Sequence, residues 1–209
     1  MKTKMEKKTA GNNRSTQDVL LKAAADLFYR KGYAGTSIRD VGVKAGVSNS
    51  LLYHYFSDKE EMLFQIIIGL SQELLIDLIE IEKSVKDPVE RLRQMLVHHI
   101  KHGLKNKKKS RLIVEELLCL TGKRREKVRQ QQDEIYSLYM KTLEELAASG
   151  RIRDLDLTVL NFSLFAPINW FFKWYKEGGR LTAEEVAEST ITVLFYGILK
   201  DEKSIMKGD

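Results

Sequence analysis

The chain has 209 residues and a mass of 24.1 kDa, enough for one large or two small domains and too much for a short disulfide scaffold. Apolar residues make up 43% and charged residues 31%, with only two prolines, which favours a globular helical protein over a disordered or all-β one. The single cysteine, Cys119, excludes an internal disulfide and indicates a reducing cytoplasm.

The net charge of +6 is concentrated at one end of the chain. Residues 1–60 contain 11 Lys and Arg against 6 Asp and Glu, while residues 61–209 contain 24 against 23. A basic region confined to one end indicates a surface that meets phosphate. Residues 1–14 are lysine-rich and lack the apolar run of a secretory signal, so they predict a basic disordered tail on a cytoplasmic protein.

The next residues predict a helix-turn-helix unit within residues 15–60. A first helix begins at about Thr16 and ends before Gly32, because its apolar residues recur at three- and four-residue spacing. Ser37 is expected to cap a second short helix, and Ser48 a third that runs to about Tyr55. The third helix turns Asn49, Ser50, Tyr53 and His54 outward, and a small helix with polar tips fits the major groove of DNA.

The rest of the chain predicts further helices. Asp58, Asp87 and Thr182 are the expected caps of helices that run to about residues 82, 104 and 199. Other helices are expected at 111–120, 125–148 and 156–177, with a break at 105–110. The predicted fold is therefore all-α, with residues 61–205 as a second domain.

The helix-turn-helix residues resemble the DNA-binding domain of the TetR family of bacterial transcription regulators. The resemblance lies in Gly32-Tyr33-Ala34-Gly35-Thr36-Ser37-Ile38-Arg39-Asp40-Val41, in Ala45-Gly46-Val47-Ser48, and in Leu52-Tyr53-His54-Tyr55-Phe56 with Lys59. It implies a homodimeric repressor with an N-terminal three-helix DNA-binding domain and a C-terminal helical domain for dimerisation and effector binding. It assigns double-stranded DNA, as a palindromic operator, to the N-terminal domain.

The resemblance carries DNA contacts to particular positions. They are Ser48, Asn49, Ser50, Tyr53, His54 and Lys59, with Thr36 and Ser37 at a cap that contacts the DNA backbone. Two departures from the family pattern stand out. Asn49-Ser50-Leu51 replaces a frequent Lys-Gly-Thr, which removes one phosphate-binding lysine. Gly42 replaces a common alanine and costs up to about 1 kcal/mol of local helix stability.

The predicted helix at 156–177 is apolar on nearly every side, so we expect it to be buried all round. One face would meet the final helix and a second subunit, and the other would line a pocket. Pro167 is expected to kink the helix. Polar groups in this apolar wall are either satisfied within the core, the favoured interpretation, or meet a ligand. The candidate ligand contacts are Asn161, Phe162, Phe165, Asn169, Trp170 and Trp174.

The segment from Asn169 to Tyr175, followed by Gly178-Gly179-Arg180-Leu181-Thr182, is similar to TetR-family regulators of fatty-acid and sterol catabolism. This second resemblance implies a small hydrophobic effector of the acyl-CoA class. Basic groups for its phosphates would come from residues 107–109, 111 and 123–125, although lysine runs in loops are usually solvated.

Other chemistry finds little support. His98 and His102 stand four residues apart and can face one metal ion, but no carboxylate or cysteine is tied to them by sequence. Surface or pocket-lining histidines are therefore favoured, and no metal or cofactor is predicted. No nucleophile motif or phosphate-binding glycine loop indicates an enzyme. The alternative is a helical small-molecule-binding protein or enzyme in which the helix-turn-helix is only structural.

Overall fold

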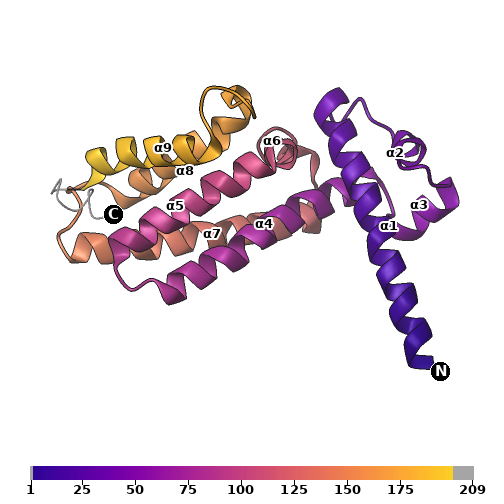
Figure 1. Ribbon diagram of the computed structural model, residues 1–209, viewed down its shortest axis with the longest axis horizontal. Coiled ribbons are helices and arrows are strands. Elements are labelled where there is room, and N and C mark those ends of the chain that lie inside the picture. Colours follow the sequence, from indigo (N-terminus) through magenta and orange to yellow (C-terminus); the bar gives the residue numbers. More distant parts are fainter. Residues whose placement is uncertain (1, 200–209) are drawn as a thin grey trace. The chain divides into compact units, whose positions relative to one another are not determined.

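The computed structural model describes residues 2–199, with side chains from residue 16 onward, and this part of the chain is all-α as predicted (Figure 1). Its helices are α1 (Lys2–Lys31), α2 (Ile38–Ala45), α3 (Asn49–Tyr55), α4 (Lys59–Ser84), α5 (Pro88–Lys105), α6 (Lys107–Glu115), α7 (Gly122–Ala148), α8 (Leu157–Trp174) and α9 (Ala183–Ile198), with a 3₁₀ turn, η1 (Leu117–Cys119), before α7. The predicted tail at 1–14 falls outside the residues described with side chains.

The predicted break at 105–110 is present but much shorter than expected. Only Asn106 separates α5 from α6, and its N–H donates to the carbonyl of His102 at 3.1 Å to end α5. Lysine is a good helix former, so a run of three does not interrupt a helix. The Ser110 hydroxyl donates to the carbonyl of Gly103 at 3.1 Å and ties the start of α6 to the end of α5. The predicted helix at 111–120 ends early, at Glu115.

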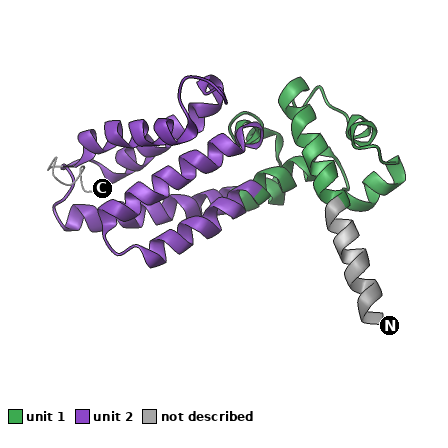
Figure 2. Cartoon of the chain, viewed as in Figure 1, with its two compact units in different colours: residues 1–69, 111–128 green, residues 70–110, 129–209 purple. Residues whose placement is uncertain are grey.

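The chain divides into two compact units (Figure 2). Unit 1 contains residues 1–69 and 111–128, and unit 2 contains residues 70–110 and 129–209. The chain therefore passes from one unit to the other three times, after residues 69, 110 and 128. Both α4 and α7 contribute residues to each unit.

Unit 1 is organised around an apolar core that collects residues from every one of its helices. Leu20, Phe28, Leu52 and Phe56 are nearly completely buried. Leu112, Leu120 and Val128, from the second segment of the unit, are buried in the same cluster. The helix-turn-helix is thus held by residues distant in sequence as well as by its own turn.

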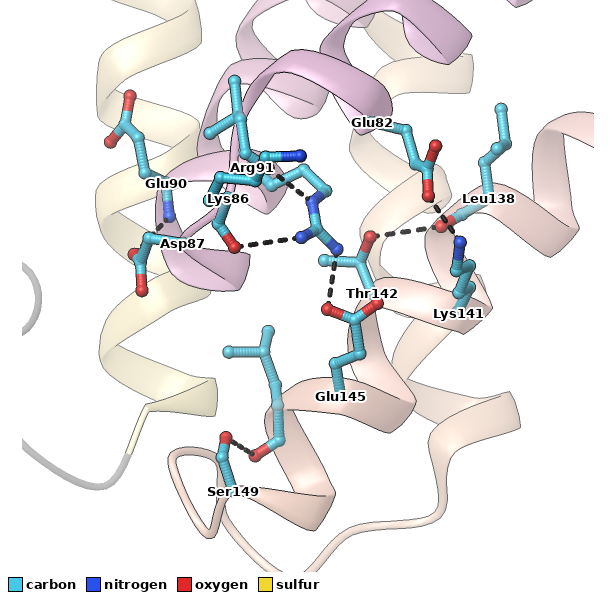
Figure 3. A network of polar contacts seen from close by, with 12 residues as sticks. Glu82, Lys86, Asp87, Glu90, Arg91, Leu138, Lys141, Thr142, Glu145 and Ser149 are labelled. Carbon is cyan, nitrogen blue, oxygen red and sulfur yellow. Dashed lines mark hydrogen bonds and ion pairs between the residues drawn. The ribbon is translucent and has the colours of Figure 1, made fainter.

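Unit 2 has a separate core and a buried charge that fixes one end of it. α5 packs against both α8 and α9. Arg91 of α5 is buried, and its guanidinium donates to the carbonyls of Val85 and Lys86 at 2.9 and 3.0 Å and to the Glu145 carboxylate of α7 at 2.8 Å (Figure 3). One side chain thus closes the α4–α5 turn onto α7, which is a structural role.

One helix within the described residues, α4, is long and apolar enough to cross a membrane by length and composition alone. More than half of its apolar window, 56%, is buried inside the protein, and its inner face supplies both cores. Core helices of soluble proteins meet the same test, so α4 is accounted for by the packing of its apolar face.

Candidate nucleic-acid interface and effector region

The helix-turn-helix is fixed by local caps. The Ser37 hydroxyl accepts from the Asp40 N–H at 3.2 Å, and the Asp40 carboxylate accepts from the Ser37 N–H at 2.8 Å, which completes a capping box at the start of α2. These bonds from Ser37 lower the pKa of Asp40. Gly46 ends α2 with a φ of 69°, in the left-handed region that favours glycine. The predicted turn therefore has the expected chemistry.

Gly42 has a packing reason that the sequence did not show. It is buried, and a Cβ added there would lie 3.2 Å from Cδ1 of Leu52 and 3.5 Å from the carbonyl oxygen of Val47. The close approach of α2 to α3 therefore favours glycine, which offsets the loss of helix propensity.

α3 exposes the predicted DNA contacts. Ser48 caps it by accepting from the Leu51 N–H at 3.2 Å, and Leu52 is its buried residue. The predicted contacts Ser48, Asn49, Ser50, Tyr53 and His54 are all exposed, Tyr53 by 52%. Tyr53 and His54 have no role in the core, so together with the serine and asparagine side chains they form a polar, solvent-exposed surface on this short helix.

Of the other three predicted contacts, Ser37 is exposed, whereas Thr36 and Lys59 are partly occupied within unit 1. Thr36 is only 2% exposed, and its hydroxyl donates to the carbonyl of Gly32 at 2.9 Å. The Lys59 ammonium donates to the carbonyl of Tyr33 at 2.8 Å and lies 4.1 Å from the centre of its ring. Burial and the neighbouring Glu60 carboxylate raise the pKa of Tyr33 to about 12. These side chains hold the loop before α2 in place.

A second polar network, missed by the sequence analysis, secures the start of α4. Arg124 donates to both carboxylate oxygens of Asp58, at 2.9 and 3.0 Å, and pairs with Glu61 at 2.9 Å. The Thr121 N–H donates to Glu60 at 2.8 Å. Burial alone would raise the pKa of Asp58, but the bonds from Arg124, the Glu61 N–H and Ser57 outweigh it and lower the pKa. The two segments of unit 1 are therefore locked together.

This network also changes the interpretation of the basic residues proposed for phosphate binding. Arg124 is paired with carboxylates, and the Arg111 side chain pairs with Glu115 and lies over the Tyr29 ring. In unit 2 the Lys107 ammonium donates to the carbonyl of Tyr175 at 2.5 Å. Three of the suggested basic groups thus have structural partners within their own units.

The interior of unit 2 contains an inner polar cluster, His99, Tyr139 and Asn161, within apolar surroundings. The Tyr139 hydroxyl donates to the carbonyl of Met95 at 3.0 Å, and His99 Nδ1 lies 3.2 Å from the same hydroxyl. Burial lowers the pKa of His99 to about 3, so its ring is neutral at physiological pH. Asn161 is fully buried; its Nδ2 donates to the carbonyl of Tyr136 at 3.2 Å, while its Oδ1 has no hydrogen-bond partner.

The candidate effector contacts divide between two faces of α8. Asn161 is buried, and Phe165 is partly buried with its ring edge-to-face against Tyr139 at 5.0 Å. Phe162, Asn169, Trp170 and Trp174 are exposed instead. The single chain thus buries only one side of α8, and burial of the other side against a second subunit stays a prediction. The helix continues through Pro167.

The exposed side of α8 continues onto α9 and forms what we call the outer face. It contains Val159, Phe162, Trp170, Trp174, Val193 and Tyr196, exposed by between 44% and 74%. A hollow of about 320 Å³ in this face is lined by Pro167, Phe171, Trp174, Ser189, Thr190, Val193 and Leu194. Contiguous exposed aromatic and aliphatic side chains of this kind mark a surface that meets another protein or a ligand.

Comparison with known proteins matches both parts of the chain. Residues 20–66 match the family model for bacterial regulatory proteins of the tetR family, and residues 85–198 match the tetracyclin repressor-like C-terminal domain. The repressor KstR2 of Mycobacterium tuberculosis H37Rv is 26% identical over 204 residues, which cover 93% of this chain and 98% of that protein.

Solved structures agree with this result. The ketosteroid regulator KstR2 of M. tuberculosis superposes with a TM-score of 0.83 at 25% identity, over 88% of this chain and 95% of that one. AibR, solved with isovaleryl coenzyme A and operator DNA, superposes with a TM-score of 0.79 at 29% identity, over 86% of this chain and 98% of that one. These relatives are regulators, which leaves the enzyme alternative without support.

Proposed function

This chain belongs to the TetR family of bacterial regulatory proteins, and we propose that it is a cytoplasmic repressor that binds a palindromic operator as a dimer and is released by an acyl-CoA. The observation that carries the proposal is α3, a short capped helix whose outward residues are polar and unused by the core. The comparison with AibR, which was solved with both operator DNA and isovaleryl coenzyme A, supports the two ligand classes.

At the DNA, we propose that Tyr53, His54, Asn49 and Ser50 face the major groove and that Ser48 and Ser37 approach the phosphates. The N-terminus of a helix offers unpaired N–H groups and a positive dipole end to an anion. Thr36 and Lys59 act mainly by holding the loop before α2, because their polar atoms already bind the carbonyls of Gly32 and Tyr33.

Dimerisation supplies the second half-site. We place it on the outer face, where Trp174 and Val193 line the hollow between α8 and α9 and are exposed by 54% and 74%. Burial of this surface against its copy would remove large apolar side chains from water, and a two-fold pair of heads matches a palindrome. Phe162 and Trp170 would then meet the second subunit.

The effector is proposed to enter the interior of unit 2 beside the inner polar cluster. Phe165 provides an apolar wall there, and the unpartnered Oδ1 of Asn161 is a hydrogen-bond acceptor that a ligand can satisfy. An acyl-CoA releases the operator only if it binds the DNA-incompetent state more tightly than the competent one. The division of α4 and α7 between the units gives such a shift a covalent route to unit 1.

The test is selection of bound DNA from a random-sequence pool by the purified full-length protein, with separate arms containing no ligand, isovaleryl-CoA, a long-chain acyl-CoA and free CoA. We expect one palindrome to be enriched without ligand and lost with an acyl-CoA but not with free CoA. A palindrome that is indifferent to every thioester would contradict the effector, and no enriched DNA would contradict the regulator.

A further inference from the structure

Unit 2 brings together three metal-binding side chains that the sequence left apart. His98 and His102 lie one turn apart on α5, and Asp77 lies on α4 beside them. One ligand atom from each residue lies within 4.8 Å of the other two. The two imidazole rings are stacked, with centroids 6.1 Å apart, so they present the same side of α5. Asp77 is the carboxylate that no sequence pattern tied to the histidine pair.

The contact between Asp77 and His98 is not an ordinary hydrogen bond. Oδ2 of Asp77 lies 2.9 Å from Nε2 of His98, close enough for an ion pair. This nitrogen is buried from solvent, yet it has no aligned hydrogen-bond partner, so the carboxylate oxygen lies off the direction of the ring N–H. A cation bound by both atoms would satisfy this buried nitrogen.

Two further oxygen-bearing groups surround His102, the carboxylate of Glu73 and the carbonyl of Leu70. Glu73 stands one helical turn before Asp77 on α4 and is exposed. Burial lowers the pKa of His102, while the carbonyl of Leu70 and the carboxylates of Glu73 and Asp77 act in the opposite direction. Nε2 of His102 lies 3.3 Å from the carbonyl oxygen of Leu70, within the same unit.

We propose that Asp77, His98 and His102 bind a divalent transition-metal ion of the Zn²⁺ class, with Glu73 or water as the fourth ligand. Imidazole and carboxylate ligands suit Zn²⁺, which lies about 2.0–2.2 Å from such atoms and holds them roughly 3.3 Å apart in a tetrahedral site. The pair at 2.9 Å is near this spacing, and the three side chains are only partly buried, so small rotations bring the others in.

The ion would join α4 to α5 by coordinate bonds in place of one charge pair. This metal site is separate from the acyl-CoA site proposed for the interior of unit 2. Metal binding there does not depend on which operator the regulator binds. A bound metal stabilises the state that holds the ligands together. We therefore expect metal binding to raise the thermal stability of the protein.

The site can be tested on the full-length dimer, purified without a histidine tag and stripped of metal. Titration with Co²⁺ should give the intense visible absorption of a tetrahedral ion, saturate at one ion per chain, and be displaced by Zn²⁺. Zn²⁺ alone should also raise the midpoint of thermal unfolding. Octahedral Co²⁺ spectra, or a titration that does not saturate, would overturn the proposal.

Three variants, one of them a control, test which residues bind the metal ion. His98→Ala with His102→Ala should abolish the Co²⁺ band and the Zn²⁺ shift, because loss of even an outer-shell partner of a ligand weakens metal binding by about 10- to 100-fold. Asp77→Asn, which keeps the shape of the side chain, should weaken binding by at least about tenfold. His54→Ala, which removes an exposed histidine from α3, is the matched control and should bind as the parent does. Equal binding by all of them would refute the site.

Discussion

The two helices assigned to binding, α3 and α8, are built in opposite ways. α3 has seven residues, a serine cap and one buried side chain, and its exposed positions are mostly polar. α8 has 18 residues, with six of them buried on one side and large apolar side chains exposed on the other. In α3 polarity distinguishes the outer side from the inner side. In α8 both sides are apolar, so hydrophobicity alone does not say which side faces the ligand and which faces a second subunit.

The contrast predicts that the outer face, which α8 shares with α9, is more sensitive to an added charge than the exposed side of α3 is. Val193→Glu on the outer face should dissociate the dimer, because an unpaired carboxylate buried in an apolar interface costs roughly 3–5 kcal/mol, or more than about a hundredfold in the dimer Kd. Sedimentation velocity over a range of concentrations measures this. Ile76→Glu, at a position on α4 that is 55% exposed, is the matched control and should stay dimeric. A dimer that survives Val193→Glu would place the interface elsewhere.

On α3 the exposed side is expected to matter for DNA and for nothing else. Tyr53→Ala with His54→Ala should weaken operator binding by about 2–4 kcal/mol, or roughly 30-fold to several hundredfold, because each good contact to a base is worth about 1–3 kcal/mol. Fluorescence anisotropy measures the affinity, and the dimer should be unaffected. Leu118→Ser, at an exposed position of unit 1 outside the motif, serves as the control. Unchanged affinity in the double variant would remove α3 from the groove.

Buried and exposed arginines of α5 extend the contrast within one helix. Arg91→Met should lower the free energy of unfolding by roughly 2–3 kcal/mol, because the carbonyls of Val85 and Lys86 lose their donor. Arg93→Met removes a more exposed pair with Glu188 and should cost less than about 1 kcal/mol. Urea unfolding compares the two. Similar losses in both variants would mean that burial of Arg91 contributes nothing.

Each unit has a helix that begins with a capping box, at Ser37 in unit 1 and at Thr182 in unit 2. Removing either cap should lower stability, but only one of the two changes should affect DNA binding. Ser37→Ala and Thr182→Ala each remove a cap and should each cost about 1 kcal/mol of stability. Only Ser37→Ala should also weaken operator binding, because Ser37 lies in the helix-turn-helix. Thermal unfolding and anisotropy on the same samples give both numbers. Weaker DNA binding in Thr182→Ala would show that the caps do not act separately.

The smallest predicted effect is the loss of stability when acid protonates Asp58 and removes its ion pair with Arg124. The folded-state pKa of Asp58 lies below its ordinary value of 3.8, so its pairing with Arg124 stabilises the protein fully above that pH and is lost as the pH falls through the lowered value. Arg124→Ala should therefore cost about 0.5–1 kcal/mol at pH 7, and the difference from the parent should shrink below about pH 4. Urea unfolding at both pH values checks this. A difference that grows in acid would contradict the assignment.

The caps and turns of both units could be predicted from the sequence, for a physical reason. Caps and turns depend on residues within four positions of each other, so Ser37, Gly46, Ser48 and Asp87 could be assigned from the printed chain. α6 was missed at its start because lysines were taken to indicate a loop rather than a helix.

Contacts between distant residues could not be assigned in this way. Arg124 meets Asp58 across 66 positions, and Asp77 meets His98 across two helices. No spacing rule in a single chain reports such pairs. Periodicity likewise showed that α8 is apolar, but it could not tell that Phe165 is partly buried and Trp170 is exposed. Both residues fit an apolar face, and only the neighbouring helices α5, α7 and α9 decide which of them is covered.

The three passages of the chain between the units limit how such a protein can be recombined. Leu112, Leu120 and Val128 belong to the core of unit 1, yet they are encoded after the whole of α5. A gene fusion that exchanged only residues 1–69 would pack the residues of a foreign DNA-binding domain against these three unchanged core residues. A working exchange must carry two separate gene segments together, so in this architecture DNA specificity and effector response diversify more readily by point substitution than by shuffling of whole heads.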